Sequence, residues 1–462
     1  MSSDAVLWGV SLAVVVAIVL PYGLAFRRRR HVDRERKAEA IELGLDRAAG
    51  QYPFIDARHC IGCGACVAAC PEEDVLGIVL GTATVVNGLR CVGHGRCELA
   101  CPVGAIQVGL GDLKSREDIP VLDEWQETTV PGIFVAGELT GMALVKNAVQ
   151  HGKKVIDRIA QRVDHARAHG PQDIYDIAIV GGGPAGLTAA ALARERGLSS
   201  ILLEQEADLG GTILHYPRRQ LVLVQTLEIP FLGSLREGEY PKERLLELFE
   251  DLTRRASLNV RFQEKVVDVR HQKGHFALRT ARAEFASRFV ILALGRRGTP
   301  RKLGVPGEER PKVTYQLTDA AAYEGQRILV VGGGDSAVEA AIGLARQRGN
   351  TLTLSYRREK LVRIKKRNED GIAELFRRGR VRPLFSSEVA EIQEDRVQLR
   401  VGDRSLELPN DYVFIFAGGE PPFGFLRQIG LRFGGESKPA AAPAPRKPTG
   451  SEARAFGDAG RA

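Results

Sequence analysis

The chain has 462 residues, which is room for about three domains. Its 44% hydrophobic and 26% charged residues are ordinary proportions for a folded protein. The net charge is +8, but lysine and arginine are spread along the chain and form no single patch interleaved with aromatic residues. This distribution argues against nucleic-acid binding.

The first segment is apolar. Residues 5–26 contain no charged side chain, and 22 residues are enough to span a bilayer. Four arginines follow at 27–30, so the positive-inside tendency places this end in the cytoplasm. A cleaved signal peptide is the alternative, but no basic residue precedes the segment and no small-x-small site precedes the arginines. We predict a single-pass anchor in the cytoplasmic (inner) membrane over 1–30, a charged stalk over 31–51 and catalytic domains in the cytoplasm.

A cysteine-rich stretch follows. All seven cysteines lie in an internal repeat of C-x2-C-x2-C-x3-C-P, whose second copy starts 31 positions after the first. One cysteine is replaced by histidine, so the candidate ligands are Cys60, Cys63, Cys66, Cys70, Cys91, His94, Cys97 and Cys101. This is the pattern of bacterial ferredoxins, in which the cysteine before proline ligates the other cluster.

Two other interpretations of these cysteines are a disulfide framework and a zinc site. Disulfides are disfavoured because the downstream chain has no cysteine and resembles a cytosolic nucleotide-binding enzyme. Zinc sites rarely use four close cysteines repeated in this way. We predict two 4Fe-4S clusters in a domain over 52–109. The resemblance to two-cluster ferredoxins implies crossed ligand sets, one of Cys60, Cys63, Cys66 and Cys101 and one of Cys70, Cys91, His94 and Cys97.

His94 is the odd member of the second set. Histidine can replace cysteine on iron, and in Rieske centres this raises the reduction potential. We expect His94 to ligate the second cluster. The alternative is a cluster with three cysteines, an open iron and a solvated histidine nearby.

A dinucleotide-binding pattern begins at residue 176. A short apolar strand over 176–180 runs into a G-x-G-x-x-G loop, an Ala-rich helix over 187–196 and a strand over 200–203 that ends in an acid. The glycines let backbone N–H groups approach a pyrophosphate at a helix N-terminus, and the acid binds a ribose hydroxyl. A lone glycine loop could be a simple turn, but here every part is in order. The predicted contacts are Gly181, Gly183, Pro184, Ala185, Gly186 and Glu204.

The pattern recurs from residue 327. A strand over 327–331 precedes a second glycine loop, and the next strand, over 351–355, ends in arginines where NAD would need an acid. Arginines there suit the 2′-phosphate of NADP, so we predict NADP over NAD; a solvated basic loop is the alternative. The predicted contacts are Gly332, Gly334, Asp335, Ser336, Ala337, Arg357, Arg358 and Arg363.

Two dinucleotide folds in one chain resemble the two-domain flavoprotein reductases of the thioredoxin reductase type. Residues 209–212, which include Gly211 and Thr212, resemble the loop beside the flavin, and residues 216–219 and 355–358 are similar to the bacillithiol disulfide reductase-like branch. The resemblance implies an α/β fold with two three-layer Rossmann-like domains, to which the chain adds a small α+β ferredoxin-like domain and a transmembrane helix. It also implies FAD, NAD(P)H and a homodimer.

The chain departs from this family at its redox-active dithiol. Thioredoxin reductases carry a C-x-x-C just before the second glycine loop, whereas residues 313–324 contain no cysteine. Thioredoxin reduction by that dithiol is therefore excluded. Electrons from the flavin must leave by another route, and the iron–sulfur clusters are the obvious exit.

The flavin-closing segment is also displaced. The family ends with T-x-V-P-G-hydrophobic-F-x-x-G-D and a helix, but here a good copy stands upstream, at 129–138, with a helix expected from 141 to 159. A mere linker is the alternative. We predict a circularly permuted FAD domain in which Gly137, Glu138, Met142 and Ala143 contact the flavin. The expected divisions are the closing segment over 110–170, the FAD-binding domain over 171–310, the NAD(P)-binding domain over 311–432 and a disordered tail over 433–462.

These features predict a membrane-anchored oxidoreductase. It would pass electrons between NAD(P)H, FAD and two 4Fe-4S clusters, to or from an unidentified electron-transfer partner. The cofactors carry the chemistry, and no side chain is named as catalytic. A small-molecule disulfide reductase and a membrane-tethered redox sensor are the alternatives.

Overall fold

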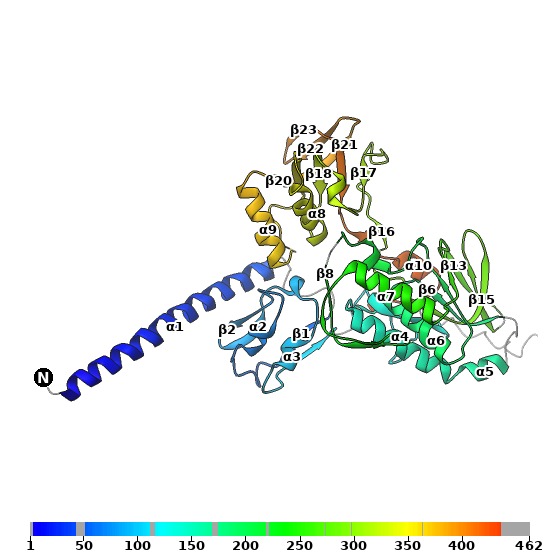
Figure 1. Ribbon diagram of the computed structural model, residues 1–462, viewed down its shortest axis with the longest axis horizontal. Coiled ribbons are helices and arrows are strands. Elements are labelled where there is room, and N and C mark those ends of the chain that lie inside the picture. The colour runs from blue at the N-terminus through cyan, green and yellow to red at the C-terminus, as the bar shows by residue number, and fades with distance from the viewer. Residues whose placement is uncertain are drawn as a thin grey trace, which may run out of the picture.

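The computed structural model describes residues 3–42, 51–110, 116–168, 174–218, 221–272, 274–296, 298–362 and 364–435. Figure 1 shows a long N-terminal helix, a small cysteine-rich domain beside its end, and two α/β domains. The expected tail and Arg363 fall outside the described residues, apart from 433–435 at the start of the tail.

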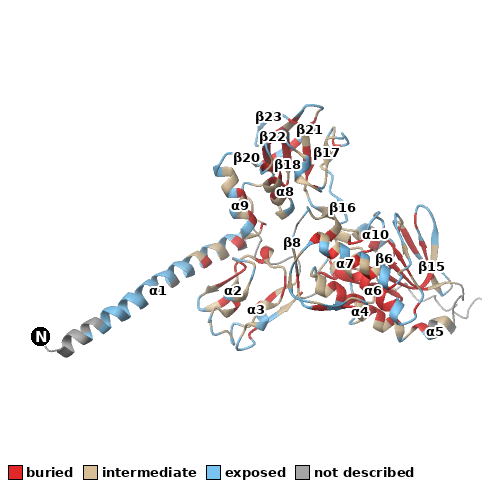
Figure 2. Ribbon diagram, in the orientation of Figure 1, coloured by how far each residue is buried: buried red, intermediate tan, exposed pale blue. Residues whose placement is uncertain are grey.

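The N-terminal helix α1 (Ser3–Glu42) has 40 residues, about 60 Å at 1.5 Å per residue. Most of its length is exposed, and buried positions appear only toward its C-terminal end (Figure 2). Among the described residues α1 alone is long and apolar enough to cross a membrane, a test that a signal sequence also passes. The anchor and the stalk were expected as separate parts; they form one continuous helix as far as Glu42.

The helix is fixed to the cysteine-rich domain by a buried carboxylate. The backbone N–H of Ile78 donates to Asp33 Oδ2 at 3.0 Å. A Cβ at Gly77 would lie 2.7 Å from Asp33 Cγ, so the glycine at this position allows the close approach of helix and strand. The stalk end of α1 is therefore part of the folded domain.

The cysteine-rich domain (residues 51–110) repeats its structure as well as its sequence. Two short helices follow the two cysteine loops, and each is preceded by a glycine in the left-handed conformation, Gly64 at φ 78° and Gly95 at φ 80°. Buried Cys66 and Cys97 pack with apolar side chains in the centre. The elements are β1 (Tyr52–Ile55) paired antiparallel with β4 (Ile106–Gly109), the hairpin β2 (Leu76–Val79) and β3 (Thr82–Val85), η1 (Gly88–Arg90), α2 (Ala65–Ala69) and α3 (Arg96–Leu99).

The first α/β domain is built on a seven-stranded sheet in the order β12-β7-β6-β15-β14-β13, with β5 also paired to β15. Successive residues of a strand point to opposite faces. Ile177 and Ile179 therefore pack under the helices, whereas Ala178 and Val180 pack on the other face. The strands are β5 (Ile133–Val135), β6 (Tyr175–Val180), β7 (Ser200–Leu203), β12 (Val260–Arg261), β13 (Asp268–Gln272), β14 (His275–Arg279) and β15 (Glu284–Leu292).

Helices and hairpins complete this domain. Helices α4, α6 and α7 contribute to the core on one face of the sheet. The helices are η3 (Gly137–Thr140), α4 (Val145–Ala160), α5 (Val163–Ala168), α6 (Pro184–Glu195), η4 (Gly211–His215) and α7 (Lys242–Arg255). The remaining strands form two antiparallel pairs, β8 (Leu221–Val224) with β11 (Gly238–Pro241) and β9 (Leu227–Ile229) with β10 (Gly233–Leu235).

The second α/β domain has three layers. A five-stranded parallel sheet in the order β17-β24-β18-β19-β20 lies between helices and a three-stranded antiparallel sheet. Ile328 and Val330 face helix α8, whereas Leu329 packs on β21 and β22. The elements are β17 (Val313–Thr314), η5 (Ala320–Ala322), β18 (Arg327–Val331), α8 (Asp335–Ala345), β19 (Thr351–Tyr356), α9 (Lys366–Arg377), β20 (Val381–Phe385), β21 (Ser387–Ile392), β22 (Arg396–Val401), β23 (Arg404–Pro409) and β24 (Tyr412–Ile415).

The chain crosses between these domains twice. Strand β16 (Thr299–Pro300) pairs antiparallel with β25 (Gly419–Glu420), and α10 (Phe423–Gln428) follows. The buried side chains of Leu426 and Phe433 pack against the sheet of the first domain. The expected division placed residues 311–432 in the second domain and a disordered tail from 433. The apolar side chains of α10 and of Leu431 are instead buried on the first domain, and so is Phe433.

Candidate functional site

The first expected ligand set lies at the outer side of the cysteine-rich domain. None of the seven cysteines forms a disulfide, and Cys63 is exposed. Backbone N–H groups point at two sulfurs, Ala83 N at 3.3 Å from Cys60 Sγ and Ala105 N at 3.2 Å from Cys101 Sγ. Such contacts favour a thiolate or a cluster-bound sulfur, and hydrogen bonds of this kind tune cluster potentials.

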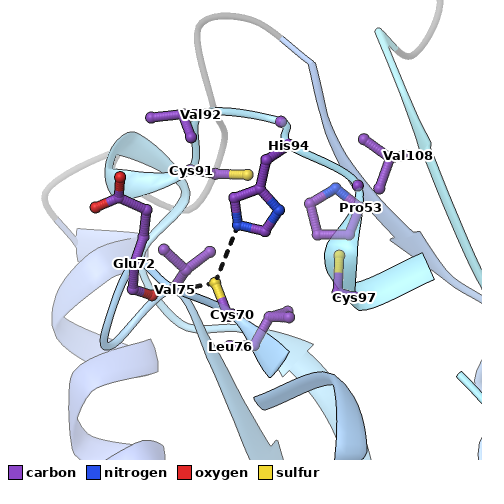
Figure 3. Close-up of a pocket in the computed structure, with 12 residues that line it drawn as sticks. Pro53, Cys70, Glu72, Val75, Leu76, Cys91, Val92, His94, Cys97 and Val108 are labelled. Carbon is purple, nitrogen blue, oxygen red and sulfur yellow. Dashed lines mark hydrogen bonds between the residues drawn. The ribbon is translucent and has the colours of Figure 1, made fainter. Parts of the chain in front are cut away.

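The second set lines one pocket. Figure 3 shows the His94 ring pointing into a space bounded by Cys91, Cys97 and Cys70, and Cys70 comes from the first half of the repeat. His94 Nε2 lies 3.7 Å from Cys70 Sγ. The crossed set that the ferredoxin resemblance implies is therefore brought together. His94 is only 9% exposed, unlike the solvated histidine of the alternative.

Burial dominates the protonation of these groups. It raises the pKa of Cys66 and of Cys70 to about 11, and neighbouring thiols add to the effect. Burial also lowers the pKa of His94, which keeps the imidazole neutral and able to bind iron or donate a hydrogen bond. Bare thiols this buried stay protonated at neutral pH, so a bound cation would have to displace their protons.

The donors of each set have the chemistry that an iron–sulfur cluster needs. Each set offers four thiol or imidazole groups, the ligands that such clusters take. In the part of the chain that the structure describes, no three His, Cys, Asp or Glu side chains are grouped as a single-ion site requires.

His94 has a defined hydrogen-bond pattern. The backbone N–H of Arg96 donates to His94 Nδ1 at 3.0 Å. A neutral imidazole with an accepting Nδ1 carries its proton on Nε2, so this arrangement directs an N–H at the sulfur of Cys70. Direct ligation by Nε2 would need that proton to leave.

The second set faces the first α/β domain. Gln225, from the loop between β8 and β9, donates through Nε2 to the backbone oxygen of His94 at 2.7 Å. Arg96 forms an ion pair with Glu237. Asn147 in α4 donates to the side chain of Gln51 at 3.2 Å, and the backbone oxygen of Gln51 lies 3.8 Å from Cys91 Sγ. The first α/β domain therefore directly contacts the residues that surround the second ligand set.

The first glycine loop has the close packing that a dinucleotide site needs. A Cβ at Gly181 would lie 2.4 Å from the backbone oxygen of Ala293, and one at Gly186 would lie 2.0 Å from that of Gly181. Gly183 directly precedes Pro184 and Ala185, the first residues of α6, where N–H groups can meet a pyrophosphate. Buried Glu204 accepts from Gly182 N at 2.5 Å and from Glu206 N at 2.9 Å.

The upstream segment reaches this loop. Strand β5 pairs parallel with β15, and a Cβ at Gly137 would lie 3.1 Å from Ala185 Cβ. Helix α4 packs on α6 at Gly152, where a Cβ would lie 2.6 Å from the Ala185 oxygen. The expected helix start at 141 was four residues early: α4 begins at Val145, and Met142 and Ala143 lie in the turn before it. Gly211, the first residue of η4, is also close to the glycine loop: its Cα lies 3.8 Å from a Cβ built at Gly183.

Three side chains that the sequence did not single out hold this segment. Buried His151 lies with Nδ1 3.5 Å from Thr140 Oγ1, and burial lowers the pKa of His151 to about 4. Arg296 donates to Asp118 at 2.7 Å, and the pKa of Asp118 is about 2 because Arg116 and Arg296 outweigh its partial burial. Burial also raises the pKa of Glu138, which the closing motif had already indicated. His151, Asp118 and Arg296 belong to no motif, so only the fold reveals them.

The second glycine loop is built in the same way. Gly332 has φ 142°, and a Cβ there would lie 2.5 Å from the Phe416 oxygen. Gly334 precedes α8, whose first three residues are Asp335, Ser336 and Ala337. The carboxylate of Asp335 is occupied by Lys365 N at 2.9 Å and Asn368 Nδ2 at 2.6 Å, so it holds the 365–368 segment in place. Both bonds end on Oδ1, and Asp335 stays one of the residues predicted to contact the nucleotide.

Arg357 and Arg358 follow β19. Among the described residues neither has an ion-pair partner, and Arg357 is exposed. Such side chains can meet a 2′-phosphate. Tyr356 packs over the loop, where a Cβ at Gly333 would lie 2.2 Å from its ring.

The second domain is also tied to the cysteine-rich domain. Arg90, only 8% exposed, binds Glu369 at 2.8 Å and Asp74 at 3.3 Å. Lys365 binds Glu72 at 3.2 Å. The cysteine-rich domain therefore contacts both α/β domains.

The comparisons with known proteins agree with this architecture. The family model of the pyridine nucleotide-disulphide oxidoreductases matches residues 178–445, and that of the 4Fe-4S dicluster domain matches residues 52–102. Among curated proteins, bacilliredoxin reductase Bdr of Bacillus subtilis is 30% identical over 56% of this chain and 81% of its own length. Ferredoxin–NADP reductase of Ignicoccus hospitalis is 30% identical over 56% of this chain and 83% of its own length.

Solved structures show the same likeness. Bacillithiol disulfide reductase Bdr from Bacillus cereus superposes with a TM-score of 0.51 and 27% identity, over 56% of this chain and 82% of its own. The Staphylococcus aureus protein of the same name gives 0.50 and 27%, over 55% and 80%. The chain therefore belongs to the pyridine nucleotide-disulphide oxidoreductases, a family of flavin-dependent NAD(P)H enzymes, and carries a 4Fe-4S ferredoxin domain ahead of its reductase part.

Proposed function

We propose that this protein is a membrane-anchored oxidoreductase that moves electrons between NAD(P)H, FAD and two 4Fe-4S clusters, and then to or from an electron-transfer partner. One observation carries the proposal. The shell of the second ligand set is shared with the first nucleotide-binding domain, through Gln225 on His94 and Asn147 on Gln51. A ferredoxin domain held this closely against a flavoprotein is placed to exchange electrons with it.

The residues of the first domain fit FAD. A Cβ at Gly181 or Gly186 would collide with a backbone oxygen, whereas Gly183 has room for one; all three would lie beside the pyrophosphate. Glu204, whose carboxylate already accepts from the backbone N–H groups of Gly182 and Glu206, would bind the ribose. When bound, FAD accepts hydride from NAD(P)H and can release electrons singly. Gly211 and Thr212 would lie beside it.

We infer that the FAD domain is circularly permuted. The pairing of β5 with β15 and the contact of Gly137 with Ala185 support a closing role for residues 110–170. Gly137, Glu138, Met142 and Ala143 would line the flavin side of this segment. The curated relatives leave 17–19% of their own length unmatched, which is compatible with a displaced closing segment. Permutation joins the cysteine-rich domain directly to the flavin-contacting segment.

The second domain fits a nicotinamide dinucleotide. Gly332, Gly334, Ser336 and Ala337 would hold the pyrophosphate at the start of α8, and Asp335 would position the neighbouring 365–368 segment. Arg357 and Arg358, with Arg363 outside the described residues, favour NADP over NAD because arginines stand directly after β19, where NAD would need an acid.

The two ligand sets fit two clusters. One is Cys60, Cys63, Cys66 and Cys101, and the other is Cys70, Cys91, His94 and Cys97; each cluster would carry one electron at a time. His94 would serve the second cluster as a ligand or through its N–H toward Cys70. Either role stabilises the reduced form and raises the potential of that cluster.

Membrane anchoring and dimer formation belong to the same proposal. Helix α1 with its arginines at 27–30 would anchor the chain in the cytoplasmic membrane, and the reductase resemblance implies a homodimer. A small-molecule disulfide reductase is the second candidate, since the similar solved structures are named bacillithiol disulfide reductases. Such a reductase would need to pass electrons from the flavin to its substrate without a dithiol beside the second glycine loop, because residues 313–324 contain no cysteine.

Anaerobic titration of the purified full chain with NADPH tests the proposal. We expect the flavin absorbance to bleach and two cluster signals to appear in EPR spectra. Flavin bleaching without a cluster signal would rule out the internal route. NADPH oxidation that proceeds only when a low-molecular-weight disulfide is added would favour the second candidate.

A further inference from the structure

A groove of about 770 Å³ lies between α1 and the cysteine-rich domain. Leu24, Ala25 and Val32 line it from α1, and Val67 and Leu76 line it from α2 and β2. Figure 1 shows α1 running past these two elements. This is the volume of a small-molecule site, and apolar side chains line it from both sides.

The groove shares a wall with the pocket of the second ligand set. Cys70 lines both spaces, and so does Leu76. Cys70 is one of the four expected ligands of the second cluster. A molecule in the groove would therefore lie against a cluster ligand, with no further protein layer at that point.

The groove lies at the boundary between the uncharged and the arginine-rich parts of α1. Leu24 and Ala25 belong to the last turn of the uncharged stretch 5–26, and Arg28 and Arg29 follow on the same helix. If residues 5–26 span the bilayer, the apolar end of the groove meets the lipid and its charged end meets the cytoplasm. A molecule dissolved in the bilayer could enter without crossing water.

The charges in the groove balance. Arg28, Arg29 and Arg36 face Asp33, Glu73 and Asp74, three of each sign. Arg36 is paired with Asp74, and Asp33 accepts from Ile78 N. Among the described residues Arg28 and Arg29 have no ion-pair partner, so their N–H groups can donate to a ligand. A balanced lining suits a neutral molecule with polar oxygens better than an anionic lipid headgroup.

We propose that this groove binds a lipid-soluble quinone, which is the electron-transfer partner of the enzyme. The inference rests on the proposed function, because the electrons must first reach the second ligand set. The overall reaction is NAD(P)H + H⁺ + quinone → NAD(P)⁺ + quinol. NAD(P)H loses two electrons and the quinone gains them. Arg28 or Arg29 would donate to a carbonyl oxygen, and Glu73 would relay protons from water.

The experiment uses the full chain in nanodiscs of zwitterionic lipid with a photoreactive azido-benzoquinone that carries a short isoprenoid chain. Mass spectrometry locates the label. We expect saturable labelling of the 67–76 segment, which lies outside the bilayer, and competition by unlabelled quinone. Labelling confined to the lipid-facing part of α1, or not reduced by competitor, would overturn the proposal.

A matched pair of variants tests the groove itself. Ala68 is exposed and lines the groove, so Ala68→Trp fills it without disturbing the core. The equivalent residue of the second repeat, 31 positions later, is Leu99, which is 87% exposed and lies outside the groove. We expect quinone binding to weaken about tenfold in Ala68→Trp, a loss of about 1.4 kcal/mol, and to stay unchanged in Leu99→Trp. Flavin and cluster absorbance checks folding. Equal labelling of both variants would contradict the assignment.

The same sample separates the two proposals. If NADPH bleaches the flavin and reduces the clusters but the 67–76 segment is not labelled, the quinone inference fails and the proposed function stands. If the segment is labelled but the clusters stay oxidised, the proposed function fails, and the inferred reaction fails with it.

Discussion

The two halves of the cysteine-rich domain have the same local structure and different surroundings. In the first half Cys63 is exposed at the surface. In the second half the equivalent residue is His94, which is buried and receives a hydrogen bond from Gln225 of the reductase part. We call the half with His94 the inner half, because Gln225 and Glu237 of the reductase part contact it beside the ligands. We call the half with Cys63 the outer half; it contacts the reductase part through the ion pair of Glu72 with Lys365.

The difference extends beyond the ligands. His59 in the outer half keeps 70% of its side chain exposed, whereas the equivalent Arg90 in the inner half is buried between Asp74 and Glu369. Sequence divergence within the repeat therefore follows contact with the rest of the chain. If electrons pass in order, the inner cluster comes first after the flavin.

The largest expected effect comes from removing Cys70, which tests whether the two ligand sets are crossed. Cys70→Ser alters the first motif but should remove the inner cluster, because Cys70 lines the pocket of Cys91 and Cys97. We expect NADPH-driven reduction of the outer cluster to be almost lost, since its electron source is gone. Cys101→Ser is the matched control, which should remove the outer cluster and leave reduction of the inner one intact. Iron analysis and EPR after NADPH addition measure both; the reverse pattern would show that the sets are not crossed.

Exchange of His94 for cysteine should change the reduction potential of the inner cluster. We expect His94→Cys to lower that potential by on the order of 100 mV, because histidine ligation or an N–H directed at Cys70 favours the reduced form. Redox titration followed by EPR gives the potential. Strong nitrogen coupling in pulsed EPR of the wild type would indicate ligation, and weak coupling would indicate a hydrogen bond. An unchanged potential would mean that His94 serves neither purpose.

The buried arginine of the inner half should stabilise domain contact. Arg90→Ala leaves Asp74 and Glu369 without their shared partner, and both acids keep some solvent access. We expect the free energy of unfolding to fall by about 2 kcal/mol, which is less than the loss when one partner of a fully buried ion pair is removed. His59→Ala at the equivalent outer position should cost about 0.5 kcal/mol or less, as exposed pairs do. Urea unfolding of the two variants compares them; equal losses would refute the inner–outer distinction.

The sequence was enough to predict the features that depend on the cysteine spacing and on the glycine loops. Both glycine loops lie at the start of helices, as expected, because backbone N–H groups at those positions need glycine around them. The cysteine repeat predicted a domain that contains its own duplicated structure. The upstream copy of the closing motif was found from local residues at 129–138, and β5 within it pairs with β15 of the first α/β domain.

The rest depends on contacts between distant residues. Nothing near Asp335 in the sequence indicates that Lys365 and Asn368 bind its carboxylate. The packing of Leu426 and Phe433 on the first domain was also missed, because apolar residues near a domain boundary fit either side until the fold is known. Arg90, His151 and Arg296 belong to no motif, so their roles follow only from the partners that the fold brings to them.

The smallest expected changes in the free energy of unfolding should be equal in the two halves. Gly64 and Gly95 precede the two short helices at φ 78° and φ 80°, a region that costs a residue with a Cβ about 1–2 kcal/mol. A Cβ at either position would meet no atom within 4 Å, so backbone strain is the whole cost in both cases. We expect Gly64→Ala and Gly95→Ala to lower the free energy of unfolding by the same amount, measured by urea unfolding under anaerobic conditions. Unequal losses would mean that the halves differ in their local backbone as well as in their surroundings, and the comparison between inner and outer clusters would then have to include the loops themselves.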